Sequence, residues 1–411
     1  MSLFEIAILV LLAAVLAVWV HRAVTIYRPS SRGPVLAREA IPAVPAAGVV
    51  SVIVPAKDEE ANIRAALDTL RAQDYPEMEI IVVSDRSRDG TAGTVRDVAA
   101  ADPRVRLVEV TELPPGWFGK PHAMHVGAGE ARGRWLLFVD ADCRQAPHSV
   151  RAGVSFLAAN QGDMLSLWPV LEMHGFWEKA VQPPAGSVLV AWFRPTWVNN
   201  PRRRTAFANG QYILIRRETY EAVGGYKSIR SELVEDIALA RRVKGAGHRL
   251  FNAVGFDLFT TRMYDSLAAM YRGWTRIYFG AFRGVARLVG VMAMTIIFTL
   301  LPFIFLAIAS VEMAAGDVAP ATPATFAVTL AAVAALVVTM RRFFVLSRGN
   351  AWYLIFYPVA VALVLAFQAG AVLRALGLSS TTWRGTTYKR GKVVAGGTQG
   401  RRDAGMHGQR H

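Results

Sequence analysis

The sequence predicts an α/β domain with a mostly parallel sheet, held at a membrane by one N-terminal and about three C-terminal transmembrane helices. Two observations lead to this prediction. Short apolar runs alternate with helical stretches between residues 49 and 262, and longer apolar stretches lie on both sides of that range. Alternation at this spacing is typical of βαβ units joined by right-handed crossovers. The composition agrees, since 53% hydrophobic and only 19% charged residues suit a chain that is partly soluble and partly in a bilayer.

Charge and cysteine content narrow the class of protein. The net charge of +15, from 46 Lys and Arg against 31 Asp and Glu, fits basic segments beside membrane helices and attraction to anionic lipid. Because no recognition motif accompanies the basic residues, we expect no nucleic-acid partner. The lone Cys143 rules out an internal disulfide, which fits a domain facing the reducing cytosol.

Residues 1–22 are predicted to be a transmembrane anchor, because the apolar run from Leu3 to Val20 is long enough to cross a bilayer. Glu5 stands where a signal peptide has basic residues, and no small-residue cleavage site follows. The basic residues after the run favour a cytoplasmic C-terminal end, and they are His21, Arg22, Arg28 and Arg32. Residues 23–48, rich in Pro and Ala, are predicted to be a linker.

Residues 49–262 are predicted to form the soluble domain. Short apolar runs predict strands at Ser51–Pro55, Glu79–Val83, Val105–Val110 and Trp135–Val139. The stretches between them predict helices at Glu60–Gln73, Thr91–Ala101 and His122–Arg132. Because the strands are almost continuously apolar, we expect helices to cover both faces of the sheet.

The C-terminal part is predicted to hold an interfacial helix followed by transmembrane segments. Residues 263–285 mix Tyr, Trp and Phe with Arg, which is typical of an amphipathic helix at a membrane surface. Residues 286–376 contain three apolar stretches that can each span, at 286–311, 319–340 and 351–376. Residues 377–411 form a basic tail that we expect to be partly disordered.

The direction of the last apolar stretch stays open. Three C-terminal spans would put the tail outside, whereas its basic residues favour the cytoplasm. Arg341, Arg342 and Arg348 also favour a cytoplasmic loop in front of this stretch. Two interpretations therefore stand: the stretch spans the bilayer, or it re-enters with a break at Pro358.

Acidic residues follow the predicted strands, at the edge of the sheet where open α/β folds bind ligands. Asp140 and Asp142 follow the strand Trp135–Val139 and lie two positions apart, so that their side chains point the same way. Carboxylate oxygens bind hard cations, which also bridge to phosphates. The pair predicts a Mg²⁺ or Mn²⁺ site that holds a nucleoside diphosphate, with Asp142 on the metal and Asp140 serving both metal and donor.

The loops after the first two strands carry candidate nucleotide-binding residues. Asp58 and Glu59 have two interpretations, either hydrogen bonds to a nucleotide base or acidic residues in the first turn of a helix. Asp85 follows the second strand and is a candidate for contacting the base or the ribose. The same segment, with Asp89 and Gly90, is also an ordinary turn before a helix.

Lys120 ends the loop Pro114-Pro-Gly-Trp-Phe-Gly-Lys120 that follows the third strand. Its ammonium group can neutralise a diphosphate as a point charge, and the helix predicted from His122 offers free N–H groups to the same anion. The alternative is a solvated lysine on a surface loop. The neighbouring acidic motifs favour the diphosphate-binding interpretation.

Asp236 is the candidate general base for an acceptor hydroxyl. A neighbouring carboxylate, Glu235, together with partial burial would raise the pKa of Asp236 towards neutral pH. The alternative is an acidic first turn of an amphipathic helix. Gln211, in the segment Asn209 to Arg217, is a candidate for the acceptor site, and that segment is equally an ordinary strand and turn.

Together these motifs resemble the family 2 glycosyltransferases of the GT-A fold over roughly residues 49–280. The segments Pro114–Lys120, Phe138–Asp142 and Asn209–Arg217 look like those of the hopanoid-associated and carotenoid glycosyltransferases, and more distantly of ceramide glucosyltransferase. The tail segment Trp383-Arg-Gly-Thr-Thr-Tyr388 is similar to the ending of those lipid enzymes. The resemblance implies inverting transfer from a nucleotide sugar, with Asp58 and Asp85 near the base, Asp142 on the metal and Asp236 as base.

Two departures from the family pattern bear on the product. Ser84-Asp85 replaces the usual Asp-Asp, so contacts to the donor base can differ. The Gln-x-x-Arg-Trp motif of processive polysaccharide synthases is absent, and its region instead carries the candidate acceptor residues Arg272, Trp274 and Arg276. This difference favours transfer of one sugar to a lipid.

The sequence therefore predicts a hexosyltransferase that moves a sugar, from a donor we expect to be a UDP-hexose, to a lipid hydroxyl. We expect an integral protein of the cytoplasmic membrane whose catalytic domain faces the cytosol. A polysaccharide synthase and a non-catalytic membrane scaffold are the alternatives. A transporter is disfavoured because charges are nearly absent from the three C-terminal apolar stretches.

Overall fold

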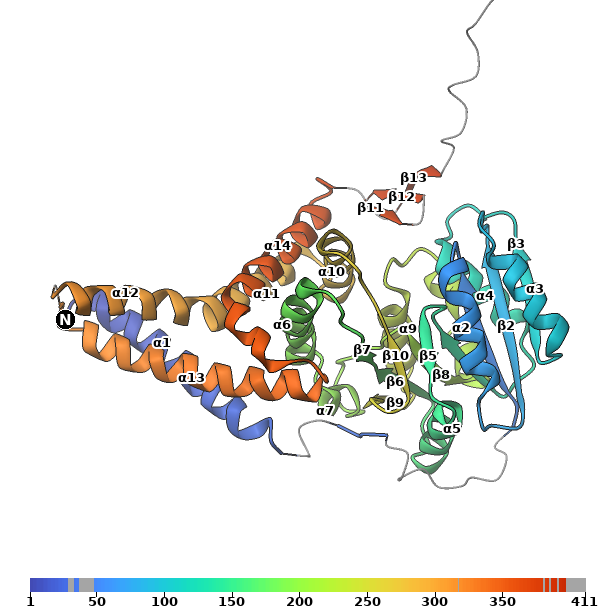
Figure 1. The fold of residues 1–411 in the computed structure, drawn as a ribbon, viewed down its shortest axis with the longest axis horizontal. Coiled ribbons are helices and arrows are strands. Elements are labelled where there is room, and N and C mark those ends of the chain that lie inside the picture. Colours follow the sequence, from blue (N-terminus) through green and yellow to red (C-terminus); the bar gives the residue numbers. More distant parts are fainter. Residues whose placement is uncertain are drawn as a thin grey trace, which may run out of the picture.

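The computed structural model describes residues 1–28, 33–36, 48–316 and 318–379, and the backbone alone of three short strands between 381 and 396. Figure 1 shows a sheet domain at one end and a group of long apolar helices at the other. Most of the predicted linker, and the predicted disordered end of the tail, lie outside the described residues. The described strands of the tail are β11 (Thr381–Trp383), β12 (Thr386–Lys389) and β13 (Lys392–Gly396).

A seven-stranded sheet forms the centre of the soluble domain, in the order β3-β2-β1-β4-β8-β6-β9. Its strands are β1 (Val50–Ala56), β2 (Met78–Asp85), β3 (Val105–Val110), β4 (Trp135–Val139), β6 (Met164–Trp168), β8 (Tyr212–Arg216) and β9 (Leu250–Val254). Strand β8 runs antiparallel to both of its neighbours, and the other pairings are parallel. The predicted mostly parallel α/β sheet is confirmed, and all four predicted strands are present.

A smaller three-stranded sheet lies beside the main one, made of β5 (Cys143–Gln145), β10 (Phe259–Thr261) and β7 (Val170–Leu171). The helices of the domain are α2 (Glu60–Arg71), α3 (Thr91–Ala101), α4 (Gly119–Glu130), α5 (Ser149–Ala159), α6 (Phe176–Trp192), α7 (Pro195–Val198), α8 (Arg217–Ala222), the 3₁₀ turn η3 (Tyr226–Ile229) and α9 (Glu235–Gly245). Helix α4 begins at Gly119, three residues before the predicted start. Pro121 is compatible with the first turn of a helix, so Lys120 lies on α4 rather than in the loop.

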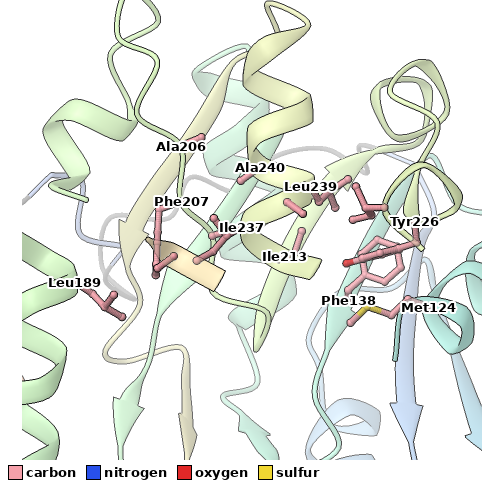
Figure 2. Packing of buried hydrophobic residues seen from close by; sticks show 14 of the residues in the cluster. Met124, Phe138, Leu189, Ala206, Phe207, Ile213, Tyr226, Ile237, Leu239 and Ala240 are labelled. Carbon is pink, nitrogen blue, oxygen red and sulfur yellow. The ribbon is translucent and has the colours of Figure 1, made fainter. Parts of the chain in front are cut away.

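Two hydrophobic clusters cover the two faces of the sheet, as the apolar strands predicted. Ile53 and Phe138 point into one cluster, and their neighbours Val52 and Leu137 point into the other. Figure 2 shows Phe138, Met124 and Tyr226 packed together in the first cluster, with the rings of Phe138 and Tyr226 edge to face at 5.0 Å. That first cluster continues into α10 and α14, so the sheet domain and the apolar helices share one core.

Among the residues that the structure describes, four helices are long and apolar enough to cross a membrane, one near the N-terminus and three in the C-terminal part. The first is α1 (Leu3–Thr25) and the third is α13 (Thr322–Leu346). The second is one continuous helix made of α11 (Val285–Thr295), the π turn η4 (Ile296–Leu300) and α12 (Leu301–Ala315). The fourth consists of the 3₁₀ turn η5 (Ala351–Phe356) followed by α14 (Tyr357–Ala375). Helices α1, α12 and α13 lie side by side, whereas α14 is inclined to them and packs on α6, α10 and α11 (Figure 1). Pro358 lies in the first turn of α14 and does not break it.

The predicted interfacial segment, residues 263–285, forms a shorter helix, α10 (Leu267–Ala281). Ser266 caps its N-terminus by accepting a hydrogen bond from the N–H of Ala269. One face of α10, with Trp274 and Tyr278, is buried against α6 and α14. The amphipathic pattern of this segment therefore reflects burial inside the protein on one side.

We predict that Leu137→Ala lowers the free energy of unfolding by about 2–5 kcal/mol, because it opens a cavity in a fully buried central strand. Leu107→Ala, on the edge strand β3 and only partly buried, is the matched control and should cost less. Chemical denaturation in detergent checks both values. Equal losses would contradict this description of the core.

Candidate active site

A polar cavity of about 190 Å³ lies at the carboxyl ends of β1, β2 and β4. Nine of the predicted site residues line it, namely Glu59, Asp85, Lys120, Asp140, Asp142, Gln211, Glu235, Asp236 and Arg276. These residues come from segments as far apart as residues 59 and 276, and the sheet topology brings them together. The arrangement is the one expected where parallel strands end at a common edge.

Lys120 lies among three of the carboxylates. Its ammonium Nζ is 2.6 Å from an oxygen of Asp140 and 3.0 Å from an oxygen of Glu235. Burial alone would lower the pKa of Lys120, but the charges of Asp140 and Glu235 outweigh it and raise the pKa above its usual value. The lysine therefore stays charged and offsets the repulsion between these acids.

Asp236 is held at the start of α9 by two backbone N–H groups. Gly210 donates to Oδ2 at 2.8 Å, and Ile237 donates to Oδ1 at 2.7 Å. Burial and the adjacent Glu235 raise the pKa of Asp236 to about 7, although Lys120 and the two N–H groups oppose the change. A carboxylate with this pKa is suited to accept a proton near neutral pH.

The pair Asp140 and Asp142 fits a divalent cation. Both carboxylates line the polar cavity, directly after β4. Within the described parts of the chain, no three His, Cys, Asp or Glu side chains form a cluster that could hold a metal by themselves. A cation here would need further oxygen ligands from phosphate or water, as Mg²⁺ commonly takes at nucleotide sites. The donor set is therefore suitable for a metal that arrives with a diphosphate.

At the β1 and β2 end of the cavity the structure separates Asp58 from Glu59. Glu59 is buried and lines the cavity. Asp58 has a positive φ of 53°, and its carboxylate accepts a hydrogen bond from the N–H of Arg88 at 2.8 Å, outside the residues that line the cavity. A direct contact of Asp58 with a nucleotide base stays a prediction, and its visible role is to hold two loops together.

Asp85 is buried and forms a two-pronged ion pair with Arg86, at 2.7 and 2.8 Å. Lys57 donates to the carbonyl oxygens of Asp85 and Arg86, at 3.3 and 3.0 Å. Lys57, Arg86 and Tyr264 all line the cavity and were not singled out from the sequence. Lys57 and Arg86 are next to Asp58 and Asp85 in the sequence, and this proximity to the acidic motifs could have identified them as cavity residues. Tyr264 reaches the cavity only through the packing of α10.

A second, larger cavity of about 770 Å³ adjoins the polar one and is largely apolar. Its wall includes Trp19 of α1, Leu189 of α6, Trp274 of α10 and Phe343 of α13. Five residues line both cavities, namely Asn209, Val234, Asp236, Met263 and Ile277. Of the predicted acceptor residues, Trp274 lines the apolar cavity, Gln211 and Arg276 line the polar one, and Arg272 is exposed and lines neither.

The fold is similar to that of a solved mannosyltransferase from Pyrobaculum calidifontis, which is in complex with GDP-Man and Mn²⁺. The similarity has a TM-score of 0.53 at 22% sequence identity and covers 90% of this chain and 97% of the other. The soluble part of this chain is a GT-A-like α/β domain.

Residues 51–236 match the family model for glycosyl transferase family 2. The chain is 27% identical over 231 residues to the 4,4'-diaponeurosporenoate glycosyltransferase of Staphylococcus aureus strain MRSA252, and 28% identical over 232 residues to that of strain USA300. The matched region covers 55% of this chain and 60% of each relative's length. The region of similarity to family 2 glycosyltransferases therefore lies within the sheet domain.

We predict that Lys120→Met destabilises the protein by about 3 kcal/mol near neutral pH, because it leaves neighbouring carboxylates buried without their cation. Lys120 opposes the rise in the pKa of Asp236, so without Lys120 the folded-state pKa of Asp236 lies further above its unfolded value and stability is lost as pH rises. The difference from the wild type should be larger at about pH 8 than at about pH 5. Denaturation in detergent at both pH values measures this.

Lys120→Arg, which keeps the positive charge, is the matched control. This variant should lose less stability than Lys120→Met, and its loss should depend less on pH. A pH-independent loss in Lys120→Met would contradict the electrostatic role of this residue.

Proposed function

We propose that this protein is a membrane-bound, metal-dependent, inverting glycosyltransferase that transfers a hexose from a nucleoside diphosphate donor to a lipid hydroxyl. One observation carries the proposal. Asp236 lies on the wall of both cavities, at the point where a polar, carboxylate-lined cavity meets an apolar one. A base at this boundary can reach the hydroxyl of an apolar acceptor and the sugar of a polar donor.

The polar cavity suits the donor. We assign Glu59, Asp85 and Lys57, which line this cavity, to the nucleoside, and Lys120 to the diphosphate. Asp140 and Asp142 would hold Mg²⁺ or Mn²⁺, and the bound cation would stabilise the negative charge of the leaving diphosphate. A UDP-hexose is the donor we favour, from the resemblance to lipid glycosyltransferases.

In the proposed reaction Asp236 takes the proton of the acceptor hydroxyl. The acceptor oxygen attacks the anomeric carbon from the face opposite the leaving diphosphate, which inverts the configuration there. The N–H groups of Gly210 and Ile237 hold the Asp236 carboxylate in place throughout. Glu235 keeps the pKa of Asp236 high and anchors Lys120.

The apolar cavity suits a lipid. Its wall combines side chains of the soluble domain with those of α1, α11, α13 and η4, which belong to helices able to span a bilayer. The relatives reported above are named for glycosyl transfer to 4,4'-diaponeurosporenoate, which supports an acceptor of lipid character for this chain as well.

Basic residues support an orientation with the soluble domain in the cytosol. His21 and Arg22 lie near the C-terminal end of α1 and, with Arg194 before α7, line the apolar cavity. Arginine and lysine favour the cytoplasmic side of a membrane helix and attract anionic headgroups. We therefore place the protein in the cytoplasmic membrane.

We predict that Asp236→Asn lowers the transfer rate by about 10²–10⁴-fold, because it removes the general base while keeping the shape of the side chain. The measurement uses detergent-purified protein, Mn²⁺, radiolabelled UDP- and GDP-sugars and a total lipid extract as acceptor. The label is counted in the organic phase. Binding of the nucleotide sugar, measured separately, should persist in the variant.

Asp265→Asn, at an exposed aspartate that lines neither cavity, is the matched control and should keep wild-type activity. The wild-type rate should also rise with pH through about 7, because Asp236 must be deprotonated to act as base. Lipid labelling by Asp236→Asn at the wild-type rate would contradict the proposal. Label entering a water-soluble polymer with wild type would favour a polysaccharide synthase.

We predict that removing divalent cations with EDTA abolishes transfer and that adding back Mg²⁺ or Mn²⁺ restores it. Asp142→Asn should raise the metal concentration needed for half-maximal activity, because one of two protein ligands is lost. Titration of each metal into the metal-free wild type and variant measures the effect. Full activity in EDTA would contradict a metal-dependent mechanism.

A further inference from the structure

The apolar cavity contains buried polar groups without partners. The side chain of Gln182 on α6 is fully buried, and neither its amide nitrogen nor its amide oxygen has a hydrogen-bond partner among the described residues. The indole N–H groups of Trp168 and Trp274 also have none. All three side chains line the apolar cavity. An unpaired buried amide is costly, so such a group calls for a partner.

These groups are not scattered over the cavity wall. Gly186 lies one turn after Gln182 on the same face of α6, and a Cβ there would be 4.0 Å from the ring of Trp274. The hydroxyl of Tyr278 donates to the carbonyl of Ala185 at 2.9 Å, which fixes α10 against this turn of α6. Gln182 and Trp274 are therefore held on facing parts of two packed helices.

The same turn of α6 also contains backbone carbonyls without their usual hydrogen-bond donors. Pro183 and Pro184 follow Gln182 inside the helix. Neither has an N–H group, so the carbonyls of Lys179 and Ala180 lack their usual helical donors. A buried helical turn with unpaired carbonyls is unfavourable by itself. The packing of α10 and α14 against α6 holds this turn in its helical shape.

Another buried glutamine provides a comparison. Gln368 of α14 is also fully buried, but its amide nitrogen donates to Thr295 at 3.0 Å, and it lines neither cavity. Gln182 thus differs from Gln368 in two ways: both of its polar atoms lack partners, and it lies on the wall of the cavity that holds Asp236.

We infer that the Gln182 amide binds a second hydroxyl group of the acceptor, so that the acceptor is a lipid with at least two hydroxyls. This inference rests on the proposed function. One hydroxyl meets Asp236 and receives the sugar, and the other lies in the apolar cavity against Gln182. A hydroxyl both donates and accepts, as does the Gln182 amide, whereas a carboxylate or phosphate would leave the amide oxygen unpaired.

The test compares lipid acceptors on the full-length protein in detergent. The probes are hexadecan-1-ol and hexadecane diols whose second hydroxyl is at carbon 2, 3, 4 or 5. Wild type should use at least one diol about tenfold better than the mono-alcohol in kcat/KM, as one well-placed hydrogen bond in a buried site allows. Gln182→Leu should reduce this ratio to about one, with an unchanged KM for the donor.

The variant also has a stability readout. Gln182→Leu removes an unpaired buried amide at similar volume, so its melting temperature should rise while its preference for diols falls. A glutamine with a purely structural role would give a lower melting temperature instead. Gln368→Leu is the matched control and should keep the wild-type preference.

Two outcomes overturn the inference: Gln182→Leu keeps the preference of the wild type, which means that the amide binds only water, or the wild type prefers no diol. If wild type transfers sugar to no lipid at all, the proposed function fails, and binding decides the inference. Native mass spectrometry without donor then compares the same alcohols. Tighter diol binding by wild type than by Gln182→Leu supports the site, and equal binding refutes it.

Discussion

The arrangement of the site depends on one charged interaction, that of the Lys120 ammonium with the carboxylates around it. Asp140 comes from the end of β4, and Glu235 and Asp236 come from the start of α9. Three acids so close together would repel one another in a partly buried cavity. Lys120, brought in by the early start of α4, lets β4 and α9 approach without that penalty.

The second constraint is the continuity of the core. One hydrophobic cluster runs from the sheet through α9 and α10 into α14, so the soluble domain is packed directly on the apolar helices. Because of this packing, α10 lines both cavities through Ile277, and α6 lines the apolar one. The meeting of a polar and an apolar cavity at Asp236 is therefore a property of the fold.

Much of the sheet and of the polar cavity could be predicted from the sequence, because their elements follow local patterns of residues. Apolar runs located β1 to β4, the acids after them located Asp85 and Asp140, and the acidic first turn of a helix located Asp236. The different positions of Asp58 and Glu59 could not be predicted, since a positive φ at Asp58 turns its side chain away. Gln182 gave no signal either, because only the packing of α6 against α10 and α14 places it in a cavity.

The two cavities also bear on how the proposed base would be controlled. Burial is the main cause of the raised pKa of Asp236, and Lys120 is the main charge that opposes it. A lipid filling the apolar cavity would exclude water from that side of Asp236 and strengthen the burial effect. A donor diphosphate bound to Lys120 would offset the positive charge that lowers the pKa of Asp236. The carboxylate would then be most basic with both substrates in place, which favours transfer to the acceptor over loss of the sugar to water.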